Sequence, residues 1–160
     1  MNPAIDPASF RQLMGHFATG VTVVTAAAPK GKLSGMTVNS FSSVSLDPPL
    51  VSICIDRGAD MHTTLSDAAG FVVNILRSDQ ETISRRFAES SPDRFSGVGY
   101  RLSAGGHPII EGVLAHIECI AYKSIDAGDH SVFLGSVVGG ASGEGLPLLF
   151  YRGGYGLDGP

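Results

Sequence analysis

Neutral hydrogen-bonding side chains are concentrated in one otherwise apolar stretch, SGMTVNSFSSVSLDPPL, residues 34–50. Its only charged residue is Asp47. A solvent-facing edge strand accounts for Ser34 and Ser42, but less well for the closely spaced polar group within residues 37–45. Such donors and acceptors suit a flat heterocycle with ring nitrogens and carbonyls, or a phosphate held without many cations. We therefore expect a ligand site along this stretch.

A second polar group, Gly128-Asp129-His130, lies between two apolar runs. Gly and Asp are ordinary residues of hairpin turns, so this tripeptide alone predicts a turn and not a site. The five histidines show no metal-ligand spacing, and we expect no metal centre. No G-x-S-x-G motif and no Ser, His and Asp set indicates a hydrolase.

Mostly short strands must position these groups. Apolar runs bounded by Gly, Pro and Asp predict strands over residues 21–27, 33–39, 50–55, 71–76, 113–123 and 131–138. The longest run alternates, with Leu114, His116, Glu118, Ile120 and Tyr122 on one face. Strands joined by short turns favour an antiparallel barrel or sandwich over a doubly wound parallel sheet.

Three helices are expected beside the strands. The first begins at Pro7 with Asp6 as its cap and ends at Gly20. Its apolar face carries Phe10, Leu13, Met14 and Phe17. A short helix is expected over residues 62–68. A capping-box pattern, Ser78 with Glu81, predicts the start of a third.

Composition limits the classes of function. The chain has 160 residues, 43% of them hydrophobic, which fits one domain spanning residues 1–160. A formal net charge of −4 argues against nucleic-acid binding. No apolar run approaches the ~20 residues of a membrane helix, and the first ten residues do not resemble a signal peptide. Cys54 and Cys119 sit in apolar runs, which indicates buried free thiols in a cytoplasmic protein, with a disulfide left open.

Taken together, these segments resemble the short-chain flavin reductases, the reductase components of two-component flavin-dependent monooxygenases. The resemblance runs from FRQLMGHFATGVTVVTA through GMTVNSFSSVSLDPPLVSICI, FVVNIL and HPIIEGVLAHIEC to GDHSVFLGSV and PLLFYRGGY. It implies a mainly β fold, an antiparallel Greek-key split barrel that binds FMN or FAD, with a few flanking helices. It also implies a homodimer that holds flavin in a groove beside the subunit interface.

The resemblance also implies roles for particular residues. The flavin's ribityl and phosphate side is expected at Thr37, Asn39 and Ser40, and its isoalloxazine ring along Ser43, Val44 and Ser45. Cys54 and Asp56 are expected at the end of the next strand, and Asp60 and Thr63 at the phosphate-binding turn and helix start. Asp60 stands where the family usually has a serine, so Thr63 and the helix N-terminus are the better phosphate candidates. His130 and Tyr155 are expected on the NADH side.

The implied reaction is hydride transfer from NADH to flavin, with the protein holding two rings in place and no protein nucleophile. NADPH is disfavoured because no Arg-rich segment suggests a 2′-phosphate clamp. The reduced flavin would diffuse to a partner monooxygenase. Two alternatives remain: a flavin carrier or storage protein on the same barrel, and an oxidase like the pyridoxamine-phosphate oxidases, which needs a basic cluster that the sequence does not offer.

Overall fold

The computed structural model describes residues 4–159. Residues 1–3 and 160 of the expected domain lie outside the described residues. Within the described range the helices are α1 (Pro7–Met14), α2 (Asp60–Asp67) and α3 (Glu81–Ala88). The strands are β1 (Thr19–Gly20), β2 (Thr22–Ala27), β3 (Leu33–Val38), β4 (Ser42–Leu46), β5 (Pro49–Asp56), β6 (Gly70–Ile75), β7 (Tyr100–Leu102), β8 (Pro108–Ile110), β9 (Ala115–Ala127), β10 (His130–Ser142), β11 (Leu149–Tyr151) and β12 (Gly154–Tyr155).

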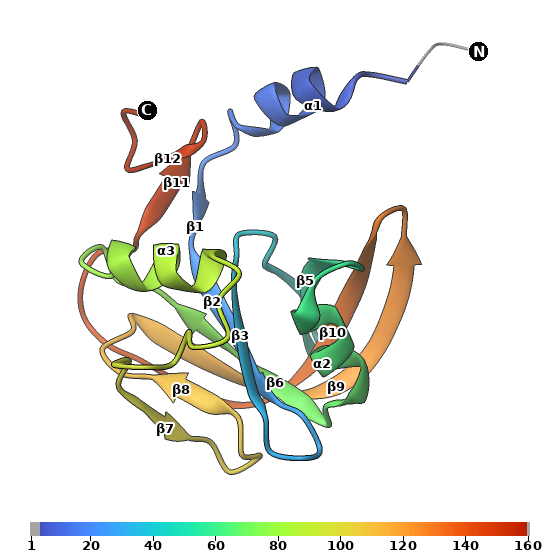
Figure 1. Ribbon diagram of the computed structural model, residues 1–160, viewed down its shortest axis with the longest axis vertical. Helices are drawn as coiled ribbons and strands as arrows, with labels where there is room; N and C mark the ends of the chain where they lie inside the picture. The colour runs from blue at the N-terminus through green and yellow to red at the C-terminus, as the bar shows by residue number, and fades with distance from the viewer. Residues whose placement is uncertain (1–3, 160) are drawn as a thin grey trace.

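The main sheet has seven antiparallel strands in the order β3-β2-β6-β9-β10-β5-β4. Its two edge strands, β3 and β4, are consecutive in the chain and joined only by residues 39–41. A linker this short spans roughly 14 Å at most, so the two edges must approach each other. The sheet therefore curls into a barrel that stays split between β3 and β4 (Figure 1). The expected split barrel is confirmed.

Two groups of buried side chains fill the molecule, and β2 contributes to both. Alternation along the strand puts Val24 in one group and Val23 in the other. The first group includes Met61 and Leu65 of α2, whereas the second includes Phe87 of α3. Each of these helices thus covers a different part of the barrel.

Helix α1 begins as expected, because the Asp6 carboxylate accepts hydrogen bonds from the backbone N–H groups of Ala8 and Ser9, both at 3.0 Å. The predicted end at Gly20 is wrong. The helix ends at Met14, and Gly20 pairs with β11 as part of β1. In Figure 1 this helix stands away from the barrel, which agrees with the exposure of its apolar side chains. The exposed fractions are Phe10 53%, Leu13 62%, Met14 52% and, beyond the helix, Phe17 72%.

Helix α2 spans Asp60–Asp67, two residues earlier at its start than expected. For α3 the predicted capping box is wrong. Gln80 is the residue before the helix, and no side chain caps the helix start. The Gln80 side chain instead accepts from the Arg77 N–H at 3.0 Å and donates to the Glu111 carbonyl at 3.0 Å. This residue ties two loops together in place of capping.

The two long strands extend further than predicted. The first apolar run ends at residue 123 and the second begins at residue 131. In the structure β9 continues to Ala127 and β10 begins at His130, so that only Gly128 and Asp129 form the turn. The register shifts beside Gly135, so that Lys123 pairs with Leu134 and Ala121 pairs with Gly135. Tyr122 is the extra residue, and the simple alternation of faces stops there.

Both cysteines are free, so the alternative of a disulfide is excluded. Cys119 is buried, and this burial raises the pKa of its thiol to about 12. Cys54 is half-buried, which corrects the expectation that both are fully enclosed. No helix within residues 4–159 is long and apolar enough to cross a bilayer.

Candidate functional site

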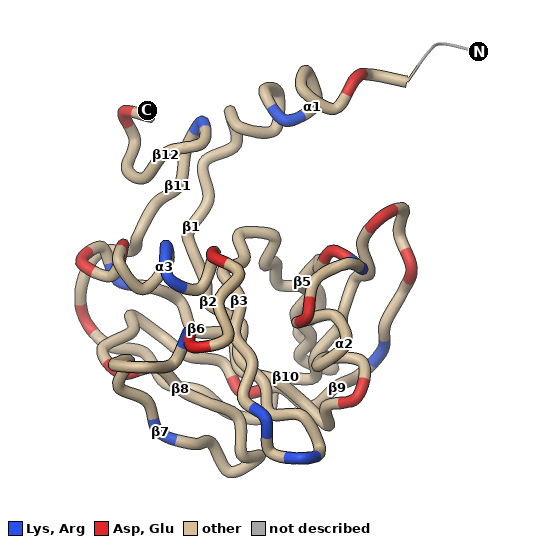
Figure 2. Tube along the Cα trace, viewed as in Figure 1, with Lys and Arg blue, Asp and Glu red and all other residues tan. Residues whose placement is uncertain are grey.

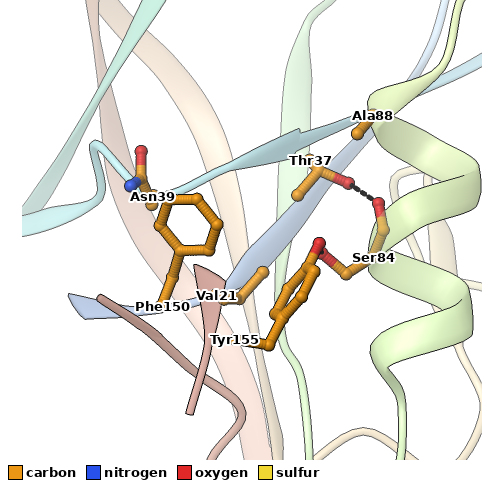
Figure 3. A pocket seen from close by; sticks show the side chains of 7 residues that line it. All are labelled: Val21, Thr37, Asn39, Ser84, Ala88, Phe150 and Tyr155. Carbon is orange, nitrogen blue, oxygen red and sulfur yellow. Dashed lines mark hydrogen bonds between the residues drawn. The ribbon is translucent and has the colours of Figure 1, made fainter. Parts of the chain in front are cut away.

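A pocket of about 180 Å³ opens at the C-terminal end of β3. Figure 3 shows the side chains that converge on it. It is lined by Val21, Thr37, Asn39, Ser84, Ala88, Phe150 and Tyr155. Five segments supply these residues: the residue before β2, β3 with the residue after it, α3, β11 and β12. Each of these lining residues is uncharged, so the pocket offers hydroxyls, one amide and aromatic rings.

Hydrogen bonds and ring contacts hold the aromatic wall of this pocket. The hydroxyl groups of Ser84 and Tyr155 are 2.7 Å apart, and Ser84 is fully buried. Thr37 donates its hydroxyl to the Ser84 carbonyl at 2.6 Å, the contact drawn in Figure 3. The Phe150 and Tyr155 rings meet edge to face, with centroids 5.5 Å apart. The Arg85 guanidinium lies 4.8 Å from the Tyr155 ring centroid, so this tyrosine is fixed on several sides.

The predicted ring-binding residues lie on the edge strand β4. This strand follows residues 39–41, the linker from which Asn39 reaches the pocket. Ser43 pairs with Val51 and Ser45 pairs with Leu50, which leaves Val44 as the extra residue of a bulge. Ser43 and Val44 are exposed and Ser45 is half-buried. Because β4 ends the sheet, one side of its backbone faces away from the ladder and can hydrogen-bond a ligand.

Ser40 has a structural task that the sequence did not indicate. Its hydroxyl donates to the Cys54 carbonyl at 2.9 Å and accepts from the Cys54 N–H at 3.1 Å. This side chain therefore continues the pairing of β5 at a point that β4 does not reach. The carboxylate of Asp56, at the end of β5, accepts the Gly58 N–H at 2.6 Å and shapes the turn into α2.

At the start of α2, Asp60 and Thr63 are exposed, and Ala59 before them provides no side-chain cap. Uncapped N–H groups at a helix start are a ready place for an anion. Asp60 also borders a second pocket together with Lys32 and Arg94, separate from the one that contains Thr37.

His130 follows the two-residue turn at the tip of the β9–β10 hairpin, so the expectation of a turn is correct. Its Nδ1 lies 2.7 Å from the Asp129 carboxylate. This hydrogen bond, together with the histidine's charge when protonated, lowers the pKa of Asp129. A carboxylate can only accept, so His130 donates through Nδ1 and presents Nε2 to other partners.

A chain of bonds fixes the hairpin against α2. Ser131 donates to the Asp126 carboxylate at 3.0 Å and lies 2.9 Å from the His62 Nε2. Arg57 reaches the other Asp126 oxygen at 3.0 Å. Figure 2 shows acidic residues along this hairpin tip, whereas α3 begins with Glu81 and carries Arg85 and Arg86 in its last turn.

The structure thus brings Thr37, Asn39 and Tyr155 into one pocket. His130 does not join them: Figure 1 shows the hairpin tip and β12 on opposite sides of the view. Sequence reasoning missed Ser84 and Phe150, which reach the pocket from segments read only as helix and closing strand. Within residues 4–159 no group of three or more His, Cys, Asp or Glu is arranged to hold a metal.

Comparisons with known proteins identify the fold and its family. Residues 14–157 match the model of the flavin reductase like domain. A flavin reductase of Pseudomonas putida is 49% identical over 96% of this chain and 91% of its own length. The reductase subunit HsaB of a flavin-dependent monooxygenase from Mycobacterium tuberculosis is 39% identical, over 97% and 84% of the two chains.

Among solved structures, the NADH:FAD oxidoreductase SgcE6 of Streptomyces globisporus, in complex with NAD and FAD fragments, superposes with a TM-score of 0.90. It is 39% identical and the match covers 97% of this chain and 96% of that one. The split barrel, the uncharged pocket beside its open edge and these similarities agree, and the chain belongs to the flavin reductase family.

Proposed function

We propose that this protein is an NADH:flavin oxidoreductase that transfers a hydride from NADH to FMN or FAD. The observation that carries the proposal is the uncharged pocket containing Thr37, Asn39 and Tyr155 next to the open β4 edge, in a chain of the flavin reductase family. A solved relative is named as an NADH:FAD oxidoreductase and contains NAD and FAD fragments. FMN and FAD share the same reacting ring, so the proposal covers both.

The residues present suit a flavin. An isoalloxazine ring offers carbonyls and ring nitrogens that need donors and acceptors, together with a flat apolar face. The β4 backbone with Ser43 and Ser45 supplies hydrogen-bonding groups, while Phe150 and Tyr155 supply apolar surface. No carboxylate lines the pocket among the described residues, so nothing in its wall repels a flavin that gains negative charge.

Flavin supplies the ring nitrogen that accepts a hydride from the nicotinamide. We assign the protein's part to position and electrostatics. Ser43, Ser45 or a β4 backbone N–H would hold the ring by donating a hydrogen bond to it. Thr37, Asn39 and Ser40 would lie on the ribityl side, with the Ser40 hydroxyl already bonded to the Cys54 backbone, and Cys54 and Asp56 would border the flavin from the end of β5. The N-terminus of α2, with Thr63, would receive the phosphate, although Asp60 beside it is an anion.

His130 contributes on the nicotinamide side. With Nδ1 held by Asp129, its Nε2 would be the atom left to contact the nicotinamide carboxamide. This contact orients the ring without taking part in bond breaking. We expect NADH to be preferred over NADPH.

The test is steady-state oxidation of NADH with and without added FMN or FAD. Turnover that depends on flavin supports the reductase. A carrier on the same barrel would bind flavin but oxidise little NADH. An oxidase acting on a phosphorylated amine would need a basic cluster, whereas the residues lining the described pocket are uncharged.

We also propose a homodimer, which the exposed outer face of β9 and β10 supports. Ile120, Tyr122 and Val138 are 55%, 56% and 60% exposed. Apolar side chains grouped in this way mark an interaction surface, and a twofold dimer is the commonest means of covering one. Ile120→Asp should lower both assembly and flavin affinity, measured by light scattering beside a flavin titration. A monomer with unchanged flavin affinity would rule out a site shared between subunits.

A flavin reductase needs a partner that uses the reduced flavin. The relative HsaB is named as the reductase subunit of a flavin-dependent monooxygenase. We propose that reduced flavin diffuses from this protein to such a partner in the cytoplasm.

A further inference from the structure

A second cavity, of about 310 Å³, lies on the other side of the aromatic wall. Phe150 and Tyr155 line both cavities, so a ligand in the first pocket can extend past these rings into the second. Ligand sites usually measure ~300–1,000 Å³, and the first pocket alone falls short of this range. The flavin-binding positions on β4 do not border the second cavity. It is therefore available to a part of a ligand that lies beyond the reacting rings.

The second cavity differs from the first in charge, because Arg85 lines it. This arginine lies over the Tyr155 ring, 4.8 Å from its centroid. Its Nε is 2.8 Å from the Glu81 carboxylate, one turn earlier on α3. The contacts with Tyr155 and Glu81 hold the guanidinium at the cavity. An ordered guanidinium is the side chain best suited to phosphate oxygens.

An acidic residue borders the same cavity. Glu89 directly follows α3, and it lines this cavity together with Arg85. A cavity for a simple anion would not include a carboxylate. A carboxylate beside a phosphate-binding group instead matches a ribose, whose 2′-hydroxyl donates to it. The aromatic side chains Phe150 and Tyr155 complete a surface that suits a purine ring.

We infer that this cavity, formed by Arg85, Glu89, Phe150 and Tyr155, binds the adenosine diphosphate half of a dinucleotide. Arg85 contacts the diphosphate, and Glu89 accepts from the ribose 2′-hydroxyl. The inference rests on the proposed function, which supplies two dinucleotides with this half, NADH and FAD. Glu89 would repel a 2′-phosphate, which makes it the residue that selects NADH over NADPH.

Substrates that lack the adenylate show whether the cavity binds the adenosine diphosphate half of NADH or that of FAD. Reduced nicotinamide mononucleotide lacks the adenylate of NADH, and FMN lacks that of FAD. With FMN as acceptor, Arg85→Gln should raise the KM for NADH about fivefold and leave the KM for the mononucleotide unchanged. If the cavity binds FAD instead, the same variant should lower the affinity for FAD relative to FMN. It should then change the KM values of NADH and of the mononucleotide equally. Arg86→Gln is the matched control, since Arg86 is on the same helix but does not line the cavity.

Glu89→Gln should increase kcat/KM with NADPH relative to NADH, because it removes the charge that faces the 2′-phosphate. A direct measurement without turnover is titration calorimetry with ADP. The wild type should bind ADP, and Arg85→Gln should bind it about fivefold more weakly.

Equal losses for whole and truncated ligands, or ADP affinity that Arg85→Gln leaves unchanged, would overturn the assignment. Absence of turnover with every nicotinamide and flavin in the wild type would instead refute the reductase, and ADP binding would still test the cavity.

Discussion

The hydroxyl groups of Ser84 and Tyr155 meet at 2.7 Å, and this contact joins α3 to the C-terminal hairpin. Ser84 is fully buried and comes from the middle of the chain, whereas Tyr155 lies in the last strand. Thr37 donates to the carbonyl of the same serine, so three separate elements meet around one residue. The wall between the two cavities depends on this junction.

Tyr155→Phe should destabilise the protein by about 1 kcal/mol, because it removes one hydrogen bond and leaves a buried hydroxyl without that partner. It should also raise the KM for NADH, since the freed ring no longer holds its orientation. Urea unfolding and steady-state kinetics measure the two effects. Tyr151→Phe, in the same hairpin, is the control. If Tyr155→Phe and Tyr151→Phe had the same unfolding free energy and the same KM for NADH, the contact with Ser84 would contribute to neither.

His130→Ala should raise the apparent KM for NADH more than it weakens flavin binding. His130 is assigned to the nicotinamide, and loss of a contact made equally in ground and transition states leaves kcat largely unchanged. Kinetics at saturating flavin and quenching of flavin fluorescence report the two quantities. A loss of flavin affinity as large as the rise in KM would place this histidine beside the flavin.

The fold was largely predictable because it depends on local patterns. Apolar runs bounded by turn signals predicted the β2–β3 hairpin and the strands β5 and β6, and Asp6 with Pro7 predicted the start of α1. The capping box at Ser78 failed because a tertiary contact, Gln80 with the Glu111 carbonyl, outweighs the local motif.

The site was harder to predict, because its walls come from segments distant in sequence. Thr37 and Asn39 were found through the resemblance, but nothing near Ser84 or Phe150 marks them as pocket residues. Ser40 shows the opposite case. Its type suggests a ligand contact, yet its hydroxyl is bonded to both backbone groups of Cys54. Only the folded chain reveals which hydroxyls are already in use.

Stability should depend on pH through His107. Burial lowers the pKa of this histidine below its ordinary value of 6.5, and its Nδ1 accepts the Ala27 N–H at 3.1 Å. Below pH 6.5 the unfolded chain therefore binds a proton that the folded protein does not. The contribution of His107 to the free energy of unfolding is therefore fully present above pH 6.5 and is lost as the pH drops below that value.

Urea titrations on either side of pH 6.5 measure this effect. His107→Asn, which keeps an acceptor, should show a smaller loss at the lower pH than the wild type, while the exposed His16→Asn should behave like the wild type. An unchanged pH dependence in His107→Asn would assign the effect to other groups.

The two thiols should differ in reactivity. Burial raises the pKa of Cys119 to about 12, so almost none of it is thiolate near neutral pH. Iodoacetamide followed by peptide mass mapping should find Cys54 alkylated first and Cys119 only after unfolding. Native Cys54→Ser should then resist alkylation. Rapid modification of Cys119 in that variant would contradict its burial in the barrel core.

As an NADH:flavin oxidoreductase, this protein should release its flavin in the reduced state. The most direct measurement is anaerobic reduction of FMN or FAD, present in large molar excess over the protein, after addition of NADH, followed by loss of the oxidised flavin absorbance. NADH should reduce the whole flavin pool through many turnovers. Reduction that stops at about one flavin per protein chain, or no reduction at all with either flavin, would contradict it.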